Sequence, residues 1–322
     1  IDPKALDVSS LGPMFANPNI IKIFHDADQD IRRIKADFGF EVRGLFDTRA
    51  AAATLGVESP GLASIIKAEF DIVLSKTHQR ANWAKRPLTA SMLSYAQLDV
   101  AYLHRLMSLF EERLQSQGRR AFLDAEHARL EALSPASEPY HADGYVRVKG
   151  SEKLTGTQRR YLRELYVARN EVAKRLDRTP FRVLQDRYLL SLVQRPPANR
   201  KELSNHAGIN SWVIRHAADE LLDAIDRAST LSAITRPPPK NRGPALNETQ
   251  MERFEALRKW RSKRAVEDKI DRAILMRREA MESLSRDNPT SEAELQGYLP
   301  EVVVSRFGGE ILNALANPIK RR

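Results

Sequence analysis

A chain of 322 residues, 42% of them hydrophobic, is too long for one compact core and too apolar to be disordered, so we expect two or three domains. No apolar run approaches the roughly 18 residues of a membrane-spanning helix, so no membrane partner is expected, and the absence of cysteine is consistent with a cytoplasmic protein. The formal net charge of +10 favours a polyanion such as nucleic acid as partner, although an arginine-rich protein without such a partner would carry the same charge.

Acidic residues follow the first predicted strand. The apolar run from Ile20 to Phe24 is typical of a buried strand, and an acidic segment that ends at Asp30 leads from it into a helical pattern. Further along, Tyr95 and Asp99 lie four residues apart in a second helical pattern, just over one turn, so both side chains emerge on one face. A carboxylate at a strand-to-helix junction and a Tyr/Asp pair on a later helix indicate a metal and water site for phosphodiester cleavage.

These motifs, in this order, resemble the second and third exonuclease motifs of the ribonuclease D family. Between them, Asp47-Thr48 and the segment Trp83…Arg86-Pro87-Leu88 resemble a helix start and a basic, aromatic segment of the family. The resemblance covers residues 1–118 and implies an α/β domain of the ribonuclease H-like exonuclease fold. The family's first motif, Asp-x-Glu on the opening strand, does not occur in the first forty residues. We therefore expect a nuclease domain that is incomplete at its N-terminus and lacks part of its active site.

The second half of the chain contains a repeated segment, and one copy follows each of two predicted linkers. Residues 134–149 are polar and contain Pro and Gly, and residues 231–245 contain a Pro tract. The segment starting at Leu154 matches the one starting at Leu246 at an offset of 92 residues, and each opens a long amphipathic helical pattern. Duplicated helical units after a nuclease domain resemble the helicase-and-RNase-D C-terminal (HRDC) domains of ribonuclease D. The expected organisation is a partial exonuclease domain at 1–133, an all-α HRDC domain at 150–230 and a second HRDC-like domain at 246–318.

The resemblance to ribonuclease D also implies roles for individual residues. Asp30, Tyr95 and Asp99 would be catalytic. Asp30 and Asp99 would bind two divalent metal ions, Mg²⁺ or Mn²⁺, together with the missing acidic pair, and Tyr95 would orient the attacking water. Hard divalent ions require oxygen ligands, which carboxylates provide. Residues expected to contact nucleic-acid phosphates are Lys76, Arg80 and Arg86.

Each candidate also has an ordinary structural interpretation. Asp30 could stabilise a helix N-terminus, and Asp99 could be a solvated helix carboxylate. Asp26 and Asp28 compete with Asp30, which we prefer for its position five residues after the His that follows the strand. Residues expected in structural roles, as a helix cap or in packing, are Asp47, His25 and Trp83.

The function implied by the resemblance is a 3′–5′ exoribonuclease that trims RNA 3′ ends, with tRNA precursors or other structured RNA ends as substrate, acting as a monomer. The arginine-rich faces of the repeats are expected to bind RNA electrostatically. Two alternatives stay open. A DNA 3′–5′ exonuclease would carry the same acidic site, and a non-catalytic nucleic-acid-binding scaffold would carry the same charge.

Overall fold

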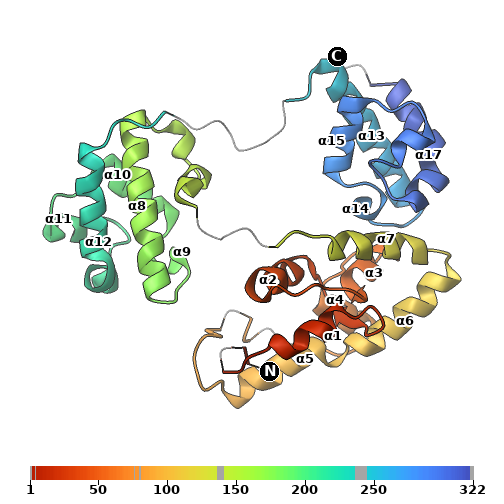
Figure 1. Ribbon diagram of the computed structural model, residues 1–322, viewed down its shortest axis with the longest axis horizontal. Helices are drawn as coiled ribbons and strands as arrows, with labels where there is room; N and C mark the ends of the chain where they lie inside the picture. Colours follow the sequence, from red (N-terminus) through yellow and green to blue (C-terminus); the bar gives the residue numbers. More distant parts are fainter. Residues whose placement is uncertain are drawn as a thin grey trace. The chain divides into compact units, whose positions relative to one another are not determined.

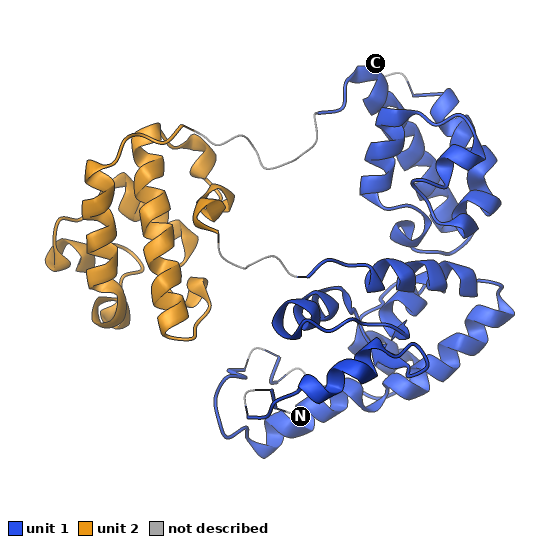
Figure 2. Ribbon diagram, in the orientation of Figure 1, with its two compact units in different colours: residues 1–137, 244–322 blue, residues 138–243 orange. Residues whose placement is uncertain are grey.

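The computed structural model of the chain describes residues 2–3, 5–75, 77–79, 81–135, 141–235 and 245–319. The chain divides into two compact units (Figures 1 and 2). One unit combines residues 1–137 with residues 244–322, and the other comprises residues 138–243. The two ends of the sequence therefore share a unit, whereas the stretch between them forms a unit of its own.

The N-terminal domain has a small parallel sheet surrounded by helices, as an α/β domain should. Strand β1 (Lys22–Phe24) pairs in parallel with β2 (Leu45–Asp47), with Ile23 opposite Phe46. Helix α2 connects the two strands, because parallel neighbours need a crossover. The helical elements of this domain are η1 (Ser9–Leu11), α1 (Gly12–Ala16), α2 (Asp28–Phe38), α3 (Thr48–Thr54), α4 (Leu62–Phe70), α5 (Ala90–Ala101), α6 (Leu103–Ser116) and α7 (Arg120–Glu131).

The core of this domain lies between α3 and α6. Ala51 and Ala52 of α3 are fully buried, and their small side chains allow the large apolar residues of α6 to pack closely. Leu106 and Phe110 of α6 are fully buried in the same cluster, together with Phe46 of strand β2. The sheet, α3 and α6 thus form one packed body, which positions the ends of the two strands.

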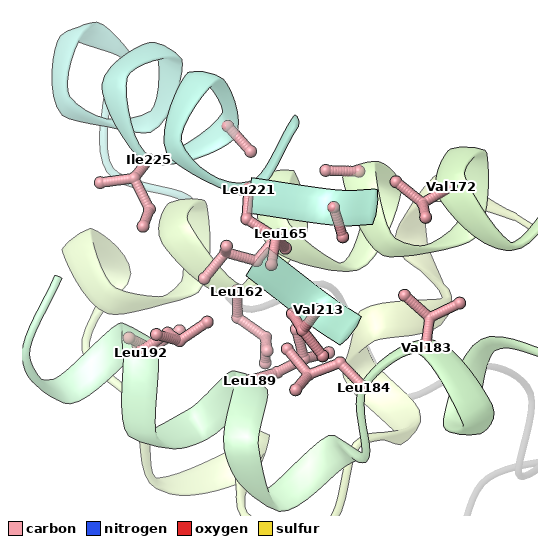
Figure 3. Packing of buried hydrophobic residues seen from close by; sticks show 14 of the residues in the cluster. Leu162, Leu165, Val172, Val183, Leu184, Leu189, Leu192, Val213, Leu221 and Ile225 are labelled. Carbon is pink, nitrogen blue, oxygen red and sulfur yellow. The ribbon is translucent and has the colours of Figure 1, made fainter. Parts of the chain in front are cut away.

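The first helical domain is an all-α bundle whose core is shown in Figure 3. Its long helix α8 begins with a capping box, in which Thr155 and Gln158 bond to each other's backbone N–H groups. The predicted linker at 134–149 is too long: Tyr145 and Val148 are 1% and 2% exposed and belong to the core of this domain. The polar residues around Tyr145 and Val148 concealed this packing. The helical elements are η2 (Ala142–Arg147), η3 (Ser151–Lys153), α8 (Gly156–Arg175), α9 (Pro180–Val183), α10 (Asp186–Gln194), α11 (Arg200–Ser204) and α12 (Ser211–Thr230).

The second helical domain repeats this bundle, and the predicted duplication is confirmed. Its capping box consists of Asn247 and Gln250. Arg169 of the first domain donates to the Leu184 carbonyl oxygen at 3.0 Å, and Arg261 of the second donates to the Met276 carbonyl oxygen at 2.8 Å. These matching bonds lie at the same offset of 92 residues. The helices are α13 (Glu248–Glu267), α14 (Arg272–Leu275), α15 (Arg278–Asp287), α16 (Glu292–Leu295) and α17 (Glu301–Ala316).

The second helical domain packs against the N-terminal domain within one unit. Phe122 of α7 is 2% exposed and belongs to the core of the second helical domain, where its ring lies 6.4 Å from that of Phe307. Arg119 donates to the carbonyl oxygens of Asp268 and Lys269, at 2.6 and 2.9 Å. The contact is close, because a Cβ at Gly56 would lie 2.0 Å from the Lys269 carbonyl oxygen. The sequence did not predict this packing. None of the helices in the described ranges is long and apolar enough to cross a membrane.

Candidate active site

Asp47, the last residue of β2, organises the junction from which α2 starts. Asp47 is 3% exposed, and its carboxylate accepts hydrogen bonds from four backbone N–H groups. Two belong to Arg49 and Ala50, at 2.8 and 3.1 Å, and make Asp47 the N-cap of α3, as predicted. The other two belong to Asp26 and Ala27, at 3.1 and 2.7 Å. Asp47 therefore holds two helix starts together, and one of them carries Asp30.

His127 completes this arrangement and was not predicted from the sequence. Its Nε2 accepts the Asp47 backbone N–H at 3.1 Å, and its side chain is buried. Burial, followed by the charge of Arg120, lowers the pKa of His127 to about 4, so the ring is neutral at pH 7 and can act as an acceptor. His127 follows Asp47 by 80 residues. No local pattern could have indicated the pairing.

Asp30 is exposed in the first turn of α2 and forms no ion pair or hydrogen bond with any residue in the described ranges. Its two competitors are neutralised: Asp26 pairs with Arg49 at 3.4 Å, and Asp28 pairs with Arg32 at 2.8 Å. The surrounding chain removes part of the hydration of Asp30, and the charges of Asp26 and Asp47 add to this, so its pKa is raised. Asp30 is thus a carboxylate with no cationic partner among the residues that the structure describes.

Tyr95 and Asp99 lie together on α5, as the four-residue spacing predicts. The helix begins where the Thr89 hydroxyl accepts the Met92 N–H, and it ends at Ala101. Loss of hydration raises the pKa of Asp99, and loss of hydration with the Asp99 charge raises the pKa of Tyr95. Asp99 also sits in the last turn, where unpaired carbonyl groups disfavour a negative charge. A bound cation would relieve both effects on Asp99.

Two aromatic rings, those of Trp83 and His78, lie beside the ring of Tyr95. The Trp83 ring lies 5.9 Å from that of Tyr95, and the His78 ring lies 6.1 Å from it. Trp83 is only half-buried and donates to the His78 carbonyl oxygen at 3.2 Å, so the prediction that it packs in the core is wrong. His25, by contrast, is hydrogen-bonded as predicted, with its Nδ1 2.9 Å from the Thr48 hydroxyl oxygen. Trp83 and His78 hold the Tyr95 ring from the loop that precedes α5.

The predicted phosphate-binding residues differ in what the structure describes. Arg86 is held by Asp2 through two bonds, of 2.6 and 2.9 Å, and also donates to the Trp83 carbonyl oxygen at 2.7 Å. Lys76 and Arg80 lie outside the described residues. Their contacts with nucleic acid therefore stay predictions.

The candidate metal ligands Asp30 and Asp99 have different neighbours. Asp30 lies near Asp26 and Asp47, whereas Asp99 lies beside Tyr95. Nowhere in the described part of the chain do three or more His, Cys, Asp or Glu side chains gather to hold a metal ion. The donor type nevertheless fits hard divalent ions, because Asp30 and Asp99 both offer carboxylate oxygens that pair with no described residue. The assignment of these residues as ligands stays a prediction.

Comparison with known proteins defines the class of this architecture. Residues 2–115 match the 3′-5′ exonuclease domain family, and residues 158–225 and 250–315 each match the HRDC domain. The chain is therefore a 3′–5′ exonuclease domain followed by two HRDC domains. It is 31% identical to ribonuclease D of Pseudomonas paraeruginosa over 98% of this chain and 84% of that protein. This chain belongs to the ribonuclease D family, a family of hydrolytic exoribonucleases whose exonuclease domain generally uses divalent metal ions.

Two further comparisons agree with this assignment. Ribonuclease D of Desulfotalea psychrophila is 31% identical over 74% of this chain, and the match spans 64% of that protein. The crystal structure of Escherichia coli RNase D, described as an exoribonuclease involved in structured RNA processing, has a TM-score of 0.61 and 24% identity. That match covers 98% of this chain and 84% of the other, and shows that the two share a fold.

Proposed function

We propose that the protein is a 3′–5′ exoribonuclease that shortens RNA 3′ ends by two-metal-ion hydrolysis. The observation that carries this proposal is the contrast among the acidic residues of the exonuclease domain. Asp26 and Asp28 are paired with arginine, whereas Asp30 and Asp99 have raised pKa values and no cation among the described residues. Carboxylates kept in unfavourable surroundings are typical of sites that bind a cation during function.

Asp30 and Asp99 would hold the two divalent ions, Mg²⁺ or Mn²⁺, which when bound lower the pKa of water and neutralise phosphate charge. Tyr95 would orient the attacking water. A phenol is protonated at neutral pH, and the pKa of Tyr95 is raised further, so the hydroxyl can both donate and accept a hydrogen bond. The packing of Trp83 and His78 against the ring supports this role, since an orienting group must itself be held.

RNA is the substrate that we propose, with tRNA precursors or other structured 3′ ends as its source. The support is the ribonuclease D identity of the relatives and the net charge of +10. Lys76, Arg80 and Arg86 would contact the phosphates next to the cleaved bond. We also propose that the protein is a monomer in the cytoplasm. The cysteine-free sequence is consistent with that reducing compartment, and light scattering of the purified chain would test the monomer.

We also propose that residues 1–322 alone do not cleave RNA. Neither Asp30 nor Asp99 belongs, in the described residues, to a group of three or more His, Cys, Asp or Glu side chains that could hold a metal ion, and the family's Asp-x-Glu motif does not occur in the first forty residues. In the described residues β1 bonds to one neighbour only, and Ile20 and Ile21 before it are 42% and 56% exposed. A strand with Asp-x-Glu could pair with the other edge of β1 and cover these side chains.

The experiment compares residues 1–322 with a version extended by the Asp-x-Glu strand of a family member. Both are incubated with 5′-labelled RNA and Mg²⁺ or Mn²⁺. We expect stepwise shortening from the 3′ end by the extended version only, a loss of about 10²-fold or more in Tyr95→Phe, and a loss at least as large in Asp30→Asn and Asp99→Asn. Asp37→Asn is the matched control, because Asp37 is an exposed residue of the same helix as Asp30 and pairs with Arg33.

Several outcomes would contradict the proposal. Activity that persists in EDTA would exclude metal-dependent hydrolysis, and equal losses in Asp30→Asn and Asp37→Asn would remove the special role of Asp30. Cleavage of RNA by residues 1–322 alone would show that their ligand set is sufficient. Faster degradation of DNA than of RNA of the same sequence would favour the DNA exonuclease.

A further inference from the structure

A series of ion pairs connects the second helical domain with the first turn of α2. Arg277, the N-cap residue of α15, forms an ion pair with Glu126 of α7. Arg129, one turn further along α7, donates to both carboxylate oxygens of Glu126, at 2.8 and 3.0 Å. The same guanidinium pairs with Asp28 of α2 at 3.5 Å. These four residues, which we call the bridge, thus link the second helical domain to a position two residues before Asp30.

The central residues of the bridge are shielded from water. The side chain of Glu126 is 12% exposed and that of Arg129 is 29% exposed. Partly buried ion pairs are screened less by salt than surface pairs are, and a buried charge that loses its partner is unfavourable. The bridge therefore holds its side chains in one arrangement, and removal of one member disturbs the others.

Cavities lie on both sides of the bridge. One has a volume of about 270 Å³ and is lined by Asp26 and Asp47 at the start of α2 and by Asp271 of the second helical domain. The other has a volume of about 240 Å³ and is lined by apolar residues around Phe122. Residues that line both cavities are Glu126, Arg129, Ala273, Ile274 and Arg277. Empty space provides no packing contacts, so ion pairs and not apolar packing fix the distance between the two domains here.

Helix α3 connects the second helical domain to the same junction by another route. At its start, the carboxylate of Asp47 holds the first residues of α2. At its end, the Ala53 carbonyl oxygen accepts the Asp271 N–H at 2.9 Å, and the Thr54 carbonyl oxygen accepts a bond from Arg119 at 3.1 Å. The helix has seven residues, so about 10 Å of rigid backbone separates the two ends. Two connections from the second helical domain therefore meet at the start of α2.

The repeat indicates that the bundle itself does not require Arg277. At the offset of 92 residues, Arg277 corresponds to Gln185 of the first helical domain. Both residues are the N-caps of equivalent helices, with φ angles of −74° and −71°. The first domain forms its own complete core with Gln185 at this position. Arg277 therefore serves the contact with the exonuclease domain and not the fold of its own domain.

We propose that Arg277 is a positioning residue for the exonuclease site, because it fixes the first turn of α2, and thereby Asp30, through the bridge. A metal ligand must be held to within about 0.5 Å of its working position. Asp30 has no hydrogen-bond or ion-pair partner in the described ranges, so its position depends on the helical turn that carries it. The second helical domain is then part of the scaffold of the active site. This inference rests on the proposed function for the role of Asp30.

The first measurement uses the version extended by the Asp-x-Glu strand. Arg277→Gln introduces the residue of the equivalent position in the first domain. We expect kcat to fall by about 2- to 30-fold and the Mg²⁺ concentration for half-maximal rate to rise, at an unchanged KM for RNA. A loss of stability alone would leave this Mg²⁺ concentration unchanged, and a lost RNA contact would raise KM. Arg278→Gln is the matched control, because Arg278 is 72% exposed and pairs with Glu282 of its own helix.

The second measurement uses residues 1–322 and requires no activity. The Ile31 N–H donates to the Ala27 carbonyl oxygen at 2.9 Å and closes the first turn of α2, so its hydrogen exchange reports on this turn. Arg277→Gln should reduce the protection of this amide by about 2- to 30-fold, and Arg278→Gln should not. Glu126→Gln interrupts the bridge at its centre. Adding Arg277→Gln to Glu126→Gln should therefore cause no further loss.

Equal protection of Ile31 in the wild type and in Arg277→Gln would overturn the inference, whether or not the extended version cleaves RNA. A further loss in the double variant would also overturn it, because the two residues would then act independently. Protection that depends on the bridge, without cleavage by the extended version, would reject the proposed function alone. Cleavage whose Mg²⁺ dependence is the same in the wild type and in Arg277→Gln would reject this inference alone.

Discussion

His127 should make the exonuclease domain sensitive to acid. Its pKa lies at about 4 in the folded protein and near the ordinary 6.5 in the unfolded chain. Because the folded-state pKa is lowered, the contribution of His127 to stability is complete above pH 6.5 and is lost as the pH falls toward 4. One pKa unit corresponds to about 1.4 kcal/mol, so the free energy of unfolding should decrease by about 3 kcal/mol across this range. That is a large part of the roughly 5–15 kcal/mol that stabilises a typical domain.

The structural cause can be isolated by one substitution. His127→Gln retains an acceptor oxygen for the Asp47 N–H but cannot take up a proton. We expect this variant to resemble the wild type at pH 7 and to lose much less stability at pH 5. His25, whose pKa is also lowered, remains in both proteins and cancels in the comparison.

Hydrogen exchange, corrected for the intrinsic rate at each pH, gives the measurement. The amides of Asp26, Ala27 and Asp47 report on the junction that Asp47 and His127 hold together. In the wild type their protection should decline between pH 7 and pH 5, and in His127→Gln it should decline less. An identical decline in both proteins would show that His127 does not titrate as its burial requires.

Three further outcomes are expected. Asp99→Asn should leave the melting temperature in EDTA unchanged or slightly higher, because the raised pKa shows that the fold disfavours the charged form; a clear decrease would indicate a structural role. Phe122→Ala should lower the free energy of unfolding of the unit that contains the exonuclease domain by about 3–5 kcal/mol in calorimetry. The same change at the exposed Phe181 should alter the thermal unfolding of the protein little, and equal melting of both variants would refute the packing of α7 on the second helical domain. Asn247→Ala and Thr155→Ala should each cost about 1 kcal/mol by removing a helix cap, and unchanged thermal unfolding of both would contradict the capping boxes.

Local features of the chain were predictable from sequence, and long-range ones were not. The N-cap role of Asp47 follows from the residues next to it, and the shared face of Tyr95 and Asp99 follows from helical spacing. The bond from Asp47 to His127 and the packing of Phe122 against Phe307 join segments that no periodicity relates. The error at Trp83 has the same origin, since no local pattern relates Trp83 to its neighbour Tyr95 on α5.

The repeat illustrates both what could be predicted from the sequence and what could not. The offset between Leu154 and Leu246 revealed two copies of a bundle, because core positions and caps persist in both. It did not reveal that Ile274 of the second copy would line a cavity together with Phe122 of α7, whereas Arg182 at the equivalent position of the first copy would be exposed. Residues outside the core do not shape the bundle, so their differences became informative only when the two copies could be compared in space.

The union of the two ends of the sequence in one unit has a consequence for synthesis on the ribosome. The face of α7 around Phe122 is complete early, but its partner Phe307 is made about 185 residues later. At about 5–20 residues per second, this leaves an apolar helix face uncovered for roughly 10–40 s. The first helical domain can fold during that interval, because its core is contained within residues 138–243. The apolar face of α7 in the nascent exonuclease domain therefore stays uncovered until α17 has been synthesised.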